Sequence, residues 1–174
     1  MPVPVQTTRV TPATASALAR FNAASADEVI RTLLTCLNSH HWAHRLASHR
    51  PYPDLPSLLA AADEAAYDLS PDDLTEALAT EALPPLPEDT YAAAHTALSA
   101  AYAAYEARFG HAFVICMDGM AADEALDHVL AGIRSRLTND PDEERLVAAE
   151  ELRRLARARL TGAIRGAGNC ASNH

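Results

Sequence analysis

The chain of 174 residues suits a single domain, and this length can bury a hydrophobic core without disulfides or metals to hold it together. Hydrophobic residues make up 49% of the chain and aromatic residues only 5%, with alanine dominant, which favours an all-α fold. The formal net charge of −9 argues against nucleic-acid binding, because an acidic domain repels phosphate backbones.

The cysteine pattern and the N-terminal stretch indicate the cellular compartment. Cys36, Cys116 and Cys170 are scattered and form no CxxC pair, so neither a disulfide framework nor a zinc knuckle is predicted. The N-terminal stretch lacks the basic start and apolar core of a signal peptide, and no apolar run approaches a membrane span. We therefore expect a cytoplasmic protein without a membrane segment.

The first predicted helices follow a flexible lead-in, residues 1–13, and the first of them starts at Pro12. Ser25 begins the next helix with the capping-box pattern Ser-x-x-Glu. Ser39 and Asp54 are the predicted N-caps of the third and fourth helices, and the "RPYPD" stretch between these two helices disfavours helix.

The middle of the chain alternates between strong helix signals and a proline break. Ser70, followed by proline and two acids, predicts a fifth helix that ends at about Thr80, where "ATEALPPLP" begins. Residues 88–109 predict one long helix with Gly110 just past its end. The apolar run "HAFVICM" that follows breaks the helical period, so we predict a buried extended segment.

Two further helices complete the predicted fold. One covers residues 121–137, and the other starts at Asp140 and reaches about Leu160. Residues 163–174 are predicted to be a flexible tail. The sequence therefore predicts an all-α, single-domain bundle of about eight helices over residues 14–162.

A histidine-rich stretch, "HHWAHRLASH", is the one candidate for a metal site. His40 and His44 are four residues apart and would share a helical face, as zinc ligands on a helix do. There is no HExxH glutamate and no clear third ligand. We interpret the stretch as a solvated polar face and expect no metal.

Arg159 stands out among the arginines of the last helix, because it lies on an apolar flank beside Leu152, Ala156 and Leu160. An arginine in such surroundings needs an anionic partner. That partner is either an internal carboxylate or a carboxylated ligand.

Four stretches, in the same order and with similar spacing, resemble one family over residues 16–160: "ALARFNAASADEVIRTLL", "WAHRLASHRPY", "AYEARFGHAFVIC" and "RSRLTNDPDEERLVAAEELRRLARARL". The family is 2-oxo-4-hydroxy-4-carboxy-5-ureidoimidazoline (OHCU) decarboxylase. The resemblance implies an all-α homodimer that uses no cofactor and makes S-allantoin in urate breakdown. Its substrate is a small carboxylated ring compound.

The resemblance also indicates site residues. Arg159 matches the family arginine of the substrate site directly. In the family, the backbone of the extended run lines the pocket, which implies substrate-binding roles for Phe113, Val114 and Ile115.

The remaining family positions differ. Glu81 stands where the family has its acid/base histidine, Ala82 replaces the proline after it, and the following Ser/Glu/Gln segment is absent. His111 replaces the usual aromatic residue and Ala112 the usual proline. Glu81 and His111 are therefore the catalytic candidates of a rebuilt site.

Glu81 is a poor chemical substitute for histidine. An unperturbed glutamate has a pKa of about 4.3, so at neutral pH it places a second negative charge beside the substrate carboxylate. It serves as an acid or base only if burial raises that pKa strongly. His111, Glu106 and His95 are the alternative proton relays.

Three hypotheses remain open at this point. The protein decarboxylates OHCU with a rebuilt site; or it is a different lyase or isomerase acting on another small carboxylated ring compound; or it is a non-catalytic binding or scaffolding relative.

Overall fold

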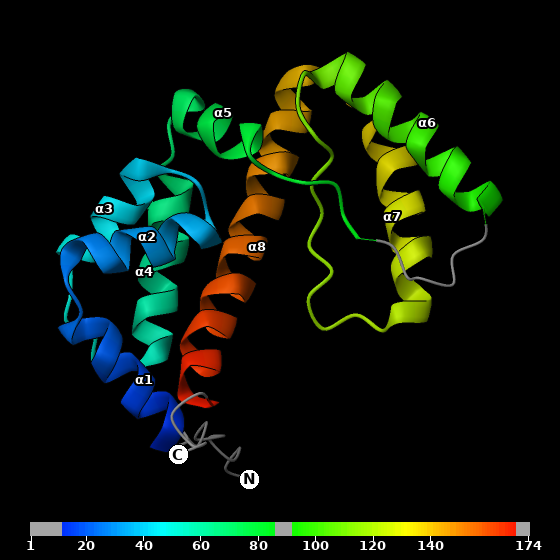
Figure 1. Cartoon of the computed structure of the whole chain (residues 1–174). Helices are drawn as coiled ribbons and strands as arrows, with labels where there is room; N and C mark the ends of the chain where they lie inside the picture. The colour runs from blue at the N-terminus through cyan, green and yellow to red at the C-terminus, as the bar shows by residue number, and fades with distance from the viewer. Residues whose placement is uncertain (1–11, 86–91, 170–174) are drawn as a thin grey trace, which may run out of the picture.

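The computed structural model describes residues 12–85 and 92–169, which fold into eight α-helices with no strand within those ranges (Figure 1). The predicted all-α bundle is thereby confirmed. The helices are α1 (Pro12–Ala23), α2 (Ala26–Cys36), α3 (His40–Ser48), α4 (Leu55–Tyr67), α5 (Pro71–Ala79), α6 (Ala92–Phe109), α7 (Ala122–Arg136) and α8 (Pro141–Asn169).

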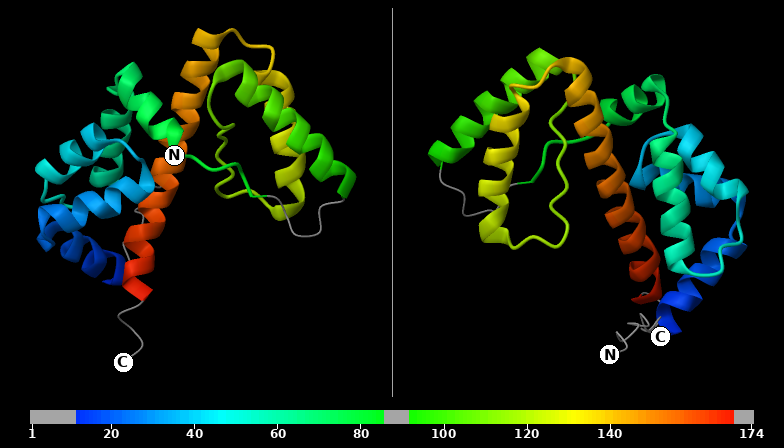
Figure 2. Two further views of the ribbon diagram at one scale, coloured as in Figure 1. Left: turned by 45° about the horizontal axis from the view of Figure 1, so that its top comes forward. Right: turned by 180° about the vertical axis from the view of Figure 1, so that it is seen from behind.

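The long helix α8 is the central element. It packs against α1, α2 and α4, and Figures 1 and 2 show it between the first four helices and the pair α6 and α7. The main core is built on these contacts, with buried side chains from α1 to α5 and from one face of α8. On α8 that face carries Ala148, Leu152, Ala156, Leu160 and Ile164, which follow the spacing of an amphipathic helix.

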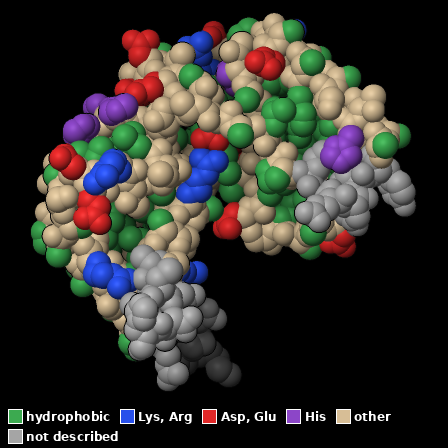
Figure 3. Space-filling view, viewed as in Figure 1, with side chains coloured by type: hydrophobic (Ala, Val, Ile, Leu, Met, Phe, Trp, Pro, Cys, Tyr) green, Lys and Arg blue, Asp and Glu red, His purple; other side chains and the backbone are tan. Residues whose placement is uncertain are grey.

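A second, smaller core lies in what we call the α6–α7 unit, formed by α6, α7 and the extended segment between them. Its buried side chains are Leu98, Tyr102, Tyr105, Phe113, Ile115, Val129 and Ile133. None of these comes from α8. Figure 3 shows the surface deeply notched between the α6–α7 unit and the C-terminal part of α8, so the unit is joined to the rest mainly through the N-terminal half of α8.

The "HAFVICM" run is extended and buried, as predicted. Phe113, Val114 and Ile115 have exposed fractions of 0%, 1% and 6%. Successive side chains of an extended segment point to opposite sides. Phe113 and Ile115 accordingly pack in the α6–α7 unit, whereas Val114 packs in the main core. The run therefore connects the two cores.

The predicted helix starts are confirmed by their caps. Each N-cap side chain accepts a hydrogen bond from a backbone N–H of the first turn, at Ser25, Ser39, Asp54 and Ser70. The capping box is complete at Ser70, where the Asp73 carboxylate accepts the Ser70 N–H in return. At Ser25 the hydroxyl half forms, and the structure gives no return bond from Glu28.

The end of α8 differs from the sequence-based expectation. The helix continues to Asn169 rather than ending near Leu160. Leu160 and Ile164 are 0% and 3% exposed in the main core, and burial against α1 stabilises the extra turns despite Gly162 and Gly166.

Parts of three predictions lie outside the described residues: the lead-in up to residue 11, the start of the long helix at 88–91, and residues 170–174 of the tail. Among the helices that are described, none combines the length and hydrophobicity required to cross a membrane.

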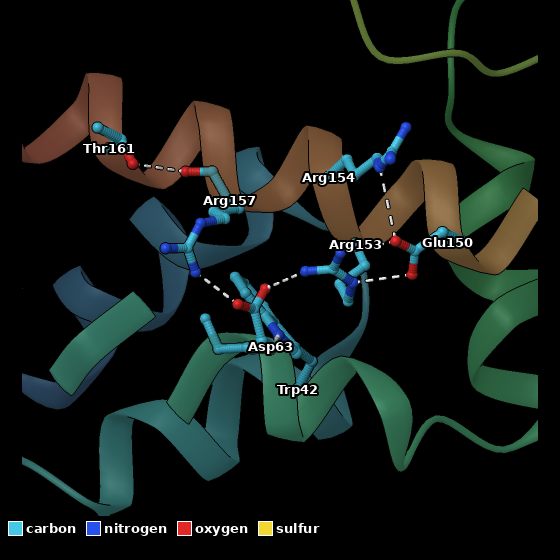
Figure 4. Close-up of polar contacts among 8 residues, drawn as sticks. Trp42, Asp63, Glu150, Arg153, Arg154, Arg157 and Thr161 are labelled. Carbon is cyan, nitrogen blue, oxygen red and sulfur yellow. Dashed lines mark hydrogen bonds and ion pairs between the residues drawn. The ribbon is translucent and has the colours of Figure 1, made fainter. Parts of the chain in front are cut away.

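A polar cluster fastens α4 to α8 (Figure 4). Asp63 on α4 accepts hydrogen bonds from both Arg153 and Arg157 on α8, and Arg153 also binds Glu150. Beneath it the indole N–H of Trp42 donates to the Ala62 carbonyl at 3.0 Å. These bonds join α4 to α8 beside the buried apolar face of α8.

Candidate functional site

Glu81 and Arg159, the two predicted site residues of opposite charge, bind each other. The Arg159 Nη1 and Nη2 atoms donate to Glu81 Oε1 and Oε2 at 2.8 and 2.9 Å, a two-bond arrangement in which guanidinium and carboxylate match. The hydrogen bonds that Arg159 donates to Glu81 raise the pKa of Arg159, and the negative charge of Glu81 adds to that effect. The internal carboxylate considered for Arg159 is therefore Glu81.

Local structure holds both partners. α5 ends at Ala79, and the Glu81 N–H donates to the Leu78 carbonyl at 3.2 Å, which places Glu81 directly beyond the helix end. Arg159 lies on α8 next to the buried Leu160, and its Nη1 also donates to the carbonyl of Cys36, the last residue of α2, at 3.2 Å. Three helices thus meet at this ion pair.

Two cavities flank Glu81. The small cavity has a volume of about 340 Å³ and is lined by Leu34, Thr35, Asn38, Thr80, Glu81, Ala82 and Arg159. The large cavity has a volume of about 630 Å³ and lies between the end of α5, the end of α6 and the start of α8. Its lining is Leu74, Thr75, Leu78, Ala79, Glu81, Glu106, Arg108, Phe109, Gly110, His111, Ala112, Pro141 and Arg145. Glu81 is common to both.

His111 lines the large cavity together with Glu81, so the structure brings the two predicted catalytic residues to one cavity. The His111 Nδ1 atom lies 3.0 Å from the Ala112 carbonyl oxygen. A carbonyl only accepts hydrogen bonds, which assigns the proton to Nδ1 and leaves Nε2 available to a ligand. The ring packs edge-on against Tyr105 with centroids 5.5 Å apart.

The other sequence candidates are placed differently. Phe113, Val114 and Ile115 are not among the residues that line either cavity, and their side chains are buried in the two cores. Of the alternative relays, Glu106 lines the large cavity, whereas His95 lines neither.

The sequence reasoning missed two cations of the large cavity, Arg108 and Arg145. Arg108 donates to the Asn139 carbonyl at 2.9 Å and to no carboxylate of the described residues. Arg145 makes no hydrogen bond or ion pair within the described part of the chain. The sequence does carry one signal for Arg145. It lies four residues after Pro141, near the predicted start of the last helix, and therefore shares a face of α8 with that residue.

A buried ion pair, also missed, positions the extended run beside the large cavity. The side chains of Arg136 and Glu144 are 7% and 0% exposed and form hydrogen bonds of 2.6 and 2.8 Å. Arg136 Nη1 also donates to the Val114 carbonyl at 2.6 Å. Glu151 reinforces this by accepting the Cys116 N–H at 2.7 Å. The backbone that carries His111 is therefore tied to α7 and α8.

The same cluster includes Tyr105, whose hydroxyl donates to Glu144. Burial raises the pKa of Tyr105 well above its usual value, and the bond to Glu144 raises it further. With Asn139 donating to the second carboxylate oxygen at 3.0 Å, Glu144 has partners on both oxygens. A buried charge of this kind is tolerated only with such compensation.

The remaining ligand-type side chains do not form a metal centre within the described residues, where no group of three or more His, Cys, Asp or Glu has a suitable arrangement. His40 Nδ1 lies 2.5 Å from a Glu76 carboxylate oxygen, and His44 is exposed. Cys36 is buried, which raises the pKa of its thiol and suits a packing role rather than a nucleophile.

With the fold and the site described, comparison with known proteins gives the class. The family model for OHCU decarboxylase matches residues 22–90 and 85–161. The chain therefore belongs to the OHCU decarboxylase family.

Solved structures share its fold. One is a crystal structure of (S)-allantoin synthase, with a TM-score of 0.65 and 19% identity; the match covers 84% of this chain and 53% of that one. Another is a crystal structure of OHCU decarboxylase in the presence of (S)-allantoin, with a TM-score of 0.64, 20% identity, and coverage of 79% and 96%. The chain spans about half the length of the former, and at these identities the likeness concerns the fold alone. No curated protein sequence gave a match.

Proposed function

We propose that this protein decarboxylates OHCU, without a cofactor, at the cavities on either side of Glu81. The observation that carries the proposal is the Glu81–Arg159 pair. In this pair, the arginine to which the family resemblance gives the substrate carboxylate binds the carboxylate of Glu81 with two hydrogen bonds at a cavity wall, which supports a carboxylate-binding role. Family membership supplies the reaction type.

The residues present support the following chemistry. Arg159 binds the substrate carboxylate and orients the carbon–carboxylate bond. When that bond breaks, carbon dioxide leaves and the electron pair passes into the adjacent unsaturated ring atoms. In this proposal the substrate extends past Glu81, which lines both cavities, so that the resulting carbanion-like carbon takes a proton from the imidazolium form of His111 in the large cavity. Water then returns a proton to the His111 ring. A positioned histidine contributes on the order of 10²- to 10⁴-fold to such a proton transfer.

Glu81 is better suited to an electrostatic role than to proton transfer in this scheme. Arg159 donates to both of its oxygens, so the Glu81 carboxylate is already engaged. His111, whose Nε2 atom is available to a ligand, is therefore the stronger catalytic candidate. We also propose, from the family resemblance, that the protein is a homodimer, which light scattering after size exclusion would test.

A second candidate function is a non-catalytic relative that binds small molecules or acts as a scaffold. The observation that favours it is the same ion pair, because Arg159 already has an internal partner. The open small cavity at Arg159 favours ligand binding over a purely structural role. A different lyase or isomerase on this scaffold would use the same residues with another carboxylated ring compound.

The experiment is turnover of enzymatically generated OHCU, followed by circular dichroism of S-allantoin. We expect His111→Gln to lower kcat by about 10²-fold or more and Arg159→Gln to raise KM. His95→Gln is the matched control, since His95 lines neither cavity, and should leave both constants unchanged. Equal rates for the native protein and its His111 variant would remove His111 from the mechanism.

A further inference from the structure

We propose that Glu81 is an internal competitor of the ligand: its carboxylate occupies the guanidinium of Arg159, and a carboxylated ligand reaches that guanidinium only by displacing it. The inference rests on the proposed function only in taking Arg159 as the carboxylate-binding residue. It changes the role of Glu81 from a replacement for a catalytic histidine to an internal competitor of the ligand.

The exposure of the two side chains supports a displaceable contact. The Glu81 side chain is 7% exposed, whereas that of Arg159 is 38% exposed. The guanidinium therefore has an open side, next to the small cavity that both residues line. A ligand can contact Arg159 from this side before the bonds to Glu81 break.

Arg159 keeps its orientation when Glu81 leaves. Its Nη1 also donates to the Cys36 carbonyl at 3.2 Å, at the C-terminal end of α2, where the helix dipole favours a cation. Its stem lies on α8 between buried residues of the main core. The guanidinium is thus held independently of Glu81 and is ready to bind another carboxylate.

Glu81 also has somewhere to move. It is the second residue beyond α5 and belongs to the non-helical residues 81–85. It lines the large cavity as well, where the cations Arg108 and Arg145 lie without a carboxylate partner among the described residues. In this inference, rotation of the Glu81 side chain moves its carboxylate from Arg159 toward the large cavity, where Arg108 and Arg145 lie together with Glu106.

The consequence is a higher threshold of affinity for every carboxylate that binds Arg159. A tethered carboxylate competes at an effective concentration of roughly millimolar or more, so a simple acid at low concentration does not replace it. A ring compound that also forms hydrogen bonds with the polar lining of the small cavity, such as Thr35, Asn38 and Thr80, has the extra affinity required. Glu81 therefore sets a threshold of affinity that a carboxylated, hydrogen-bonding ring passes at low concentration and a small aliphatic acid does not.

The test measures binding of two probes, acetate and orotate, from the shifts of the ¹⁵N-labelled arginine side-chain signals. Removing a partly exposed ion pair should raise acetate affinity about threefold in Glu81→Gln, and orotate affinity by the same factor, because both probes displace the same carboxylate. Arg159→Gln should lose both probes. Glu106→Gln is the matched control, because Glu106 lines the large cavity without binding Arg159, and should behave like the native protein.

Unchanged or weaker acetate binding in Glu81→Gln would overturn the inference. Glu81→Ala serves as a second variant should the amide itself bind Arg159, and far-UV circular dichroism verifies the fold of each. The result is separate from turnover. A gain in acetate affinity without OHCU turnover supports the inference and removes the decarboxylase proposal, whereas turnover without that gain does the reverse.

Discussion

Glu81 and Arg159 are 78 positions apart in the chain, and their side chains meet in two parallel hydrogen bonds at the junction of α2, α5 and α8. The two partners are unequal, because the glutamate is almost buried and the arginine is not. Removing the negative charge of Glu81 should therefore change stability and ligand binding differently from removing the positive charge of Arg159.

We expect Arg159→Gln to destabilise the protein more than Glu81→Gln does. Loss of the arginine leaves a 7% exposed carboxylate without its partner, which costs about 1–3 kcal/mol. Loss of the carboxylate leaves Arg159 with solvent and the Cys36 carbonyl, and should cost less than about 1 kcal/mol. Urea denaturation measures both values. The opposite order would mean that Arg159 relies on the ion pair for compensation of its charge more than Glu81 does.

The Arg136–Glu144 pair should be far more important for stability. Glu144→Gln removes the negative charge that compensates a buried guanidinium, and we expect a loss of roughly 3–5 kcal/mol in the free energy of unfolding. Glu143→Gln, at the neighbouring exposed position, should change it by less than about 0.5 kcal/mol. Similar effects from the two variants would contradict the burial of this pair.

Stability should fall at alkaline pH. The pKa of Tyr105 is raised in the folded state, mainly by burial, so above the unfolded-state value of about 10 the unfolded chain loses a proton that the folded chain keeps. Folding stability from this group is complete below pH 10 and declines above it. All 14 basic residues are arginine, so no lysine titrates in that range.

Tyr105→Phe is the matching variant, because it removes the titrating group. Its free energy of unfolding should decline less steeply between pH 10 and 11 than that of the native protein. Parallel slopes for the two proteins would show that Tyr105 does not contribute to the alkaline loss.

Asp63 should stabilise the packing of α4 on α8. Asp63→Asn removes the acceptor shared by Arg153 and Arg157, and we expect a loss of about 1–2 kcal/mol by thermal denaturation. Asp68→Asn is the control. Asp68 also pairs with an arginine, Arg45, but is 57% exposed, and its loss should cost less than about 0.5 kcal/mol.

The sequence predicted the fold well because its signals are local. Serine and aspartate caps begin the helices, Gly110 follows the long helix with a φ of +80°, and the loss of helical period marks the extended run. The length of α8 was underestimated. The glycines near its end weaken helix propensity, and only burial of Ile164 against the core compensates for them.

The sequence identified individual residues of the site but not which of them bind each other. Apolar neighbours identified Arg159 as a cation that needs a partner, and family position identified Glu81, yet nothing local indicates that the two bind each other. The Arg136–Glu144 pair escaped notice for a related reason. Its partners are charged residues near helix ends, which in a sequence look like solvated positions.

Decarboxylation at this site is tested most directly by the stereochemistry of OHCU decay with and without the native protein. We predict that the protein converts OHCU to S-allantoin faster than OHCU decays alone, and that the product has a circular dichroism signal of one enantiomer. A decay rate equal to the spontaneous one, with a racemic product, would contradict the proposed activity.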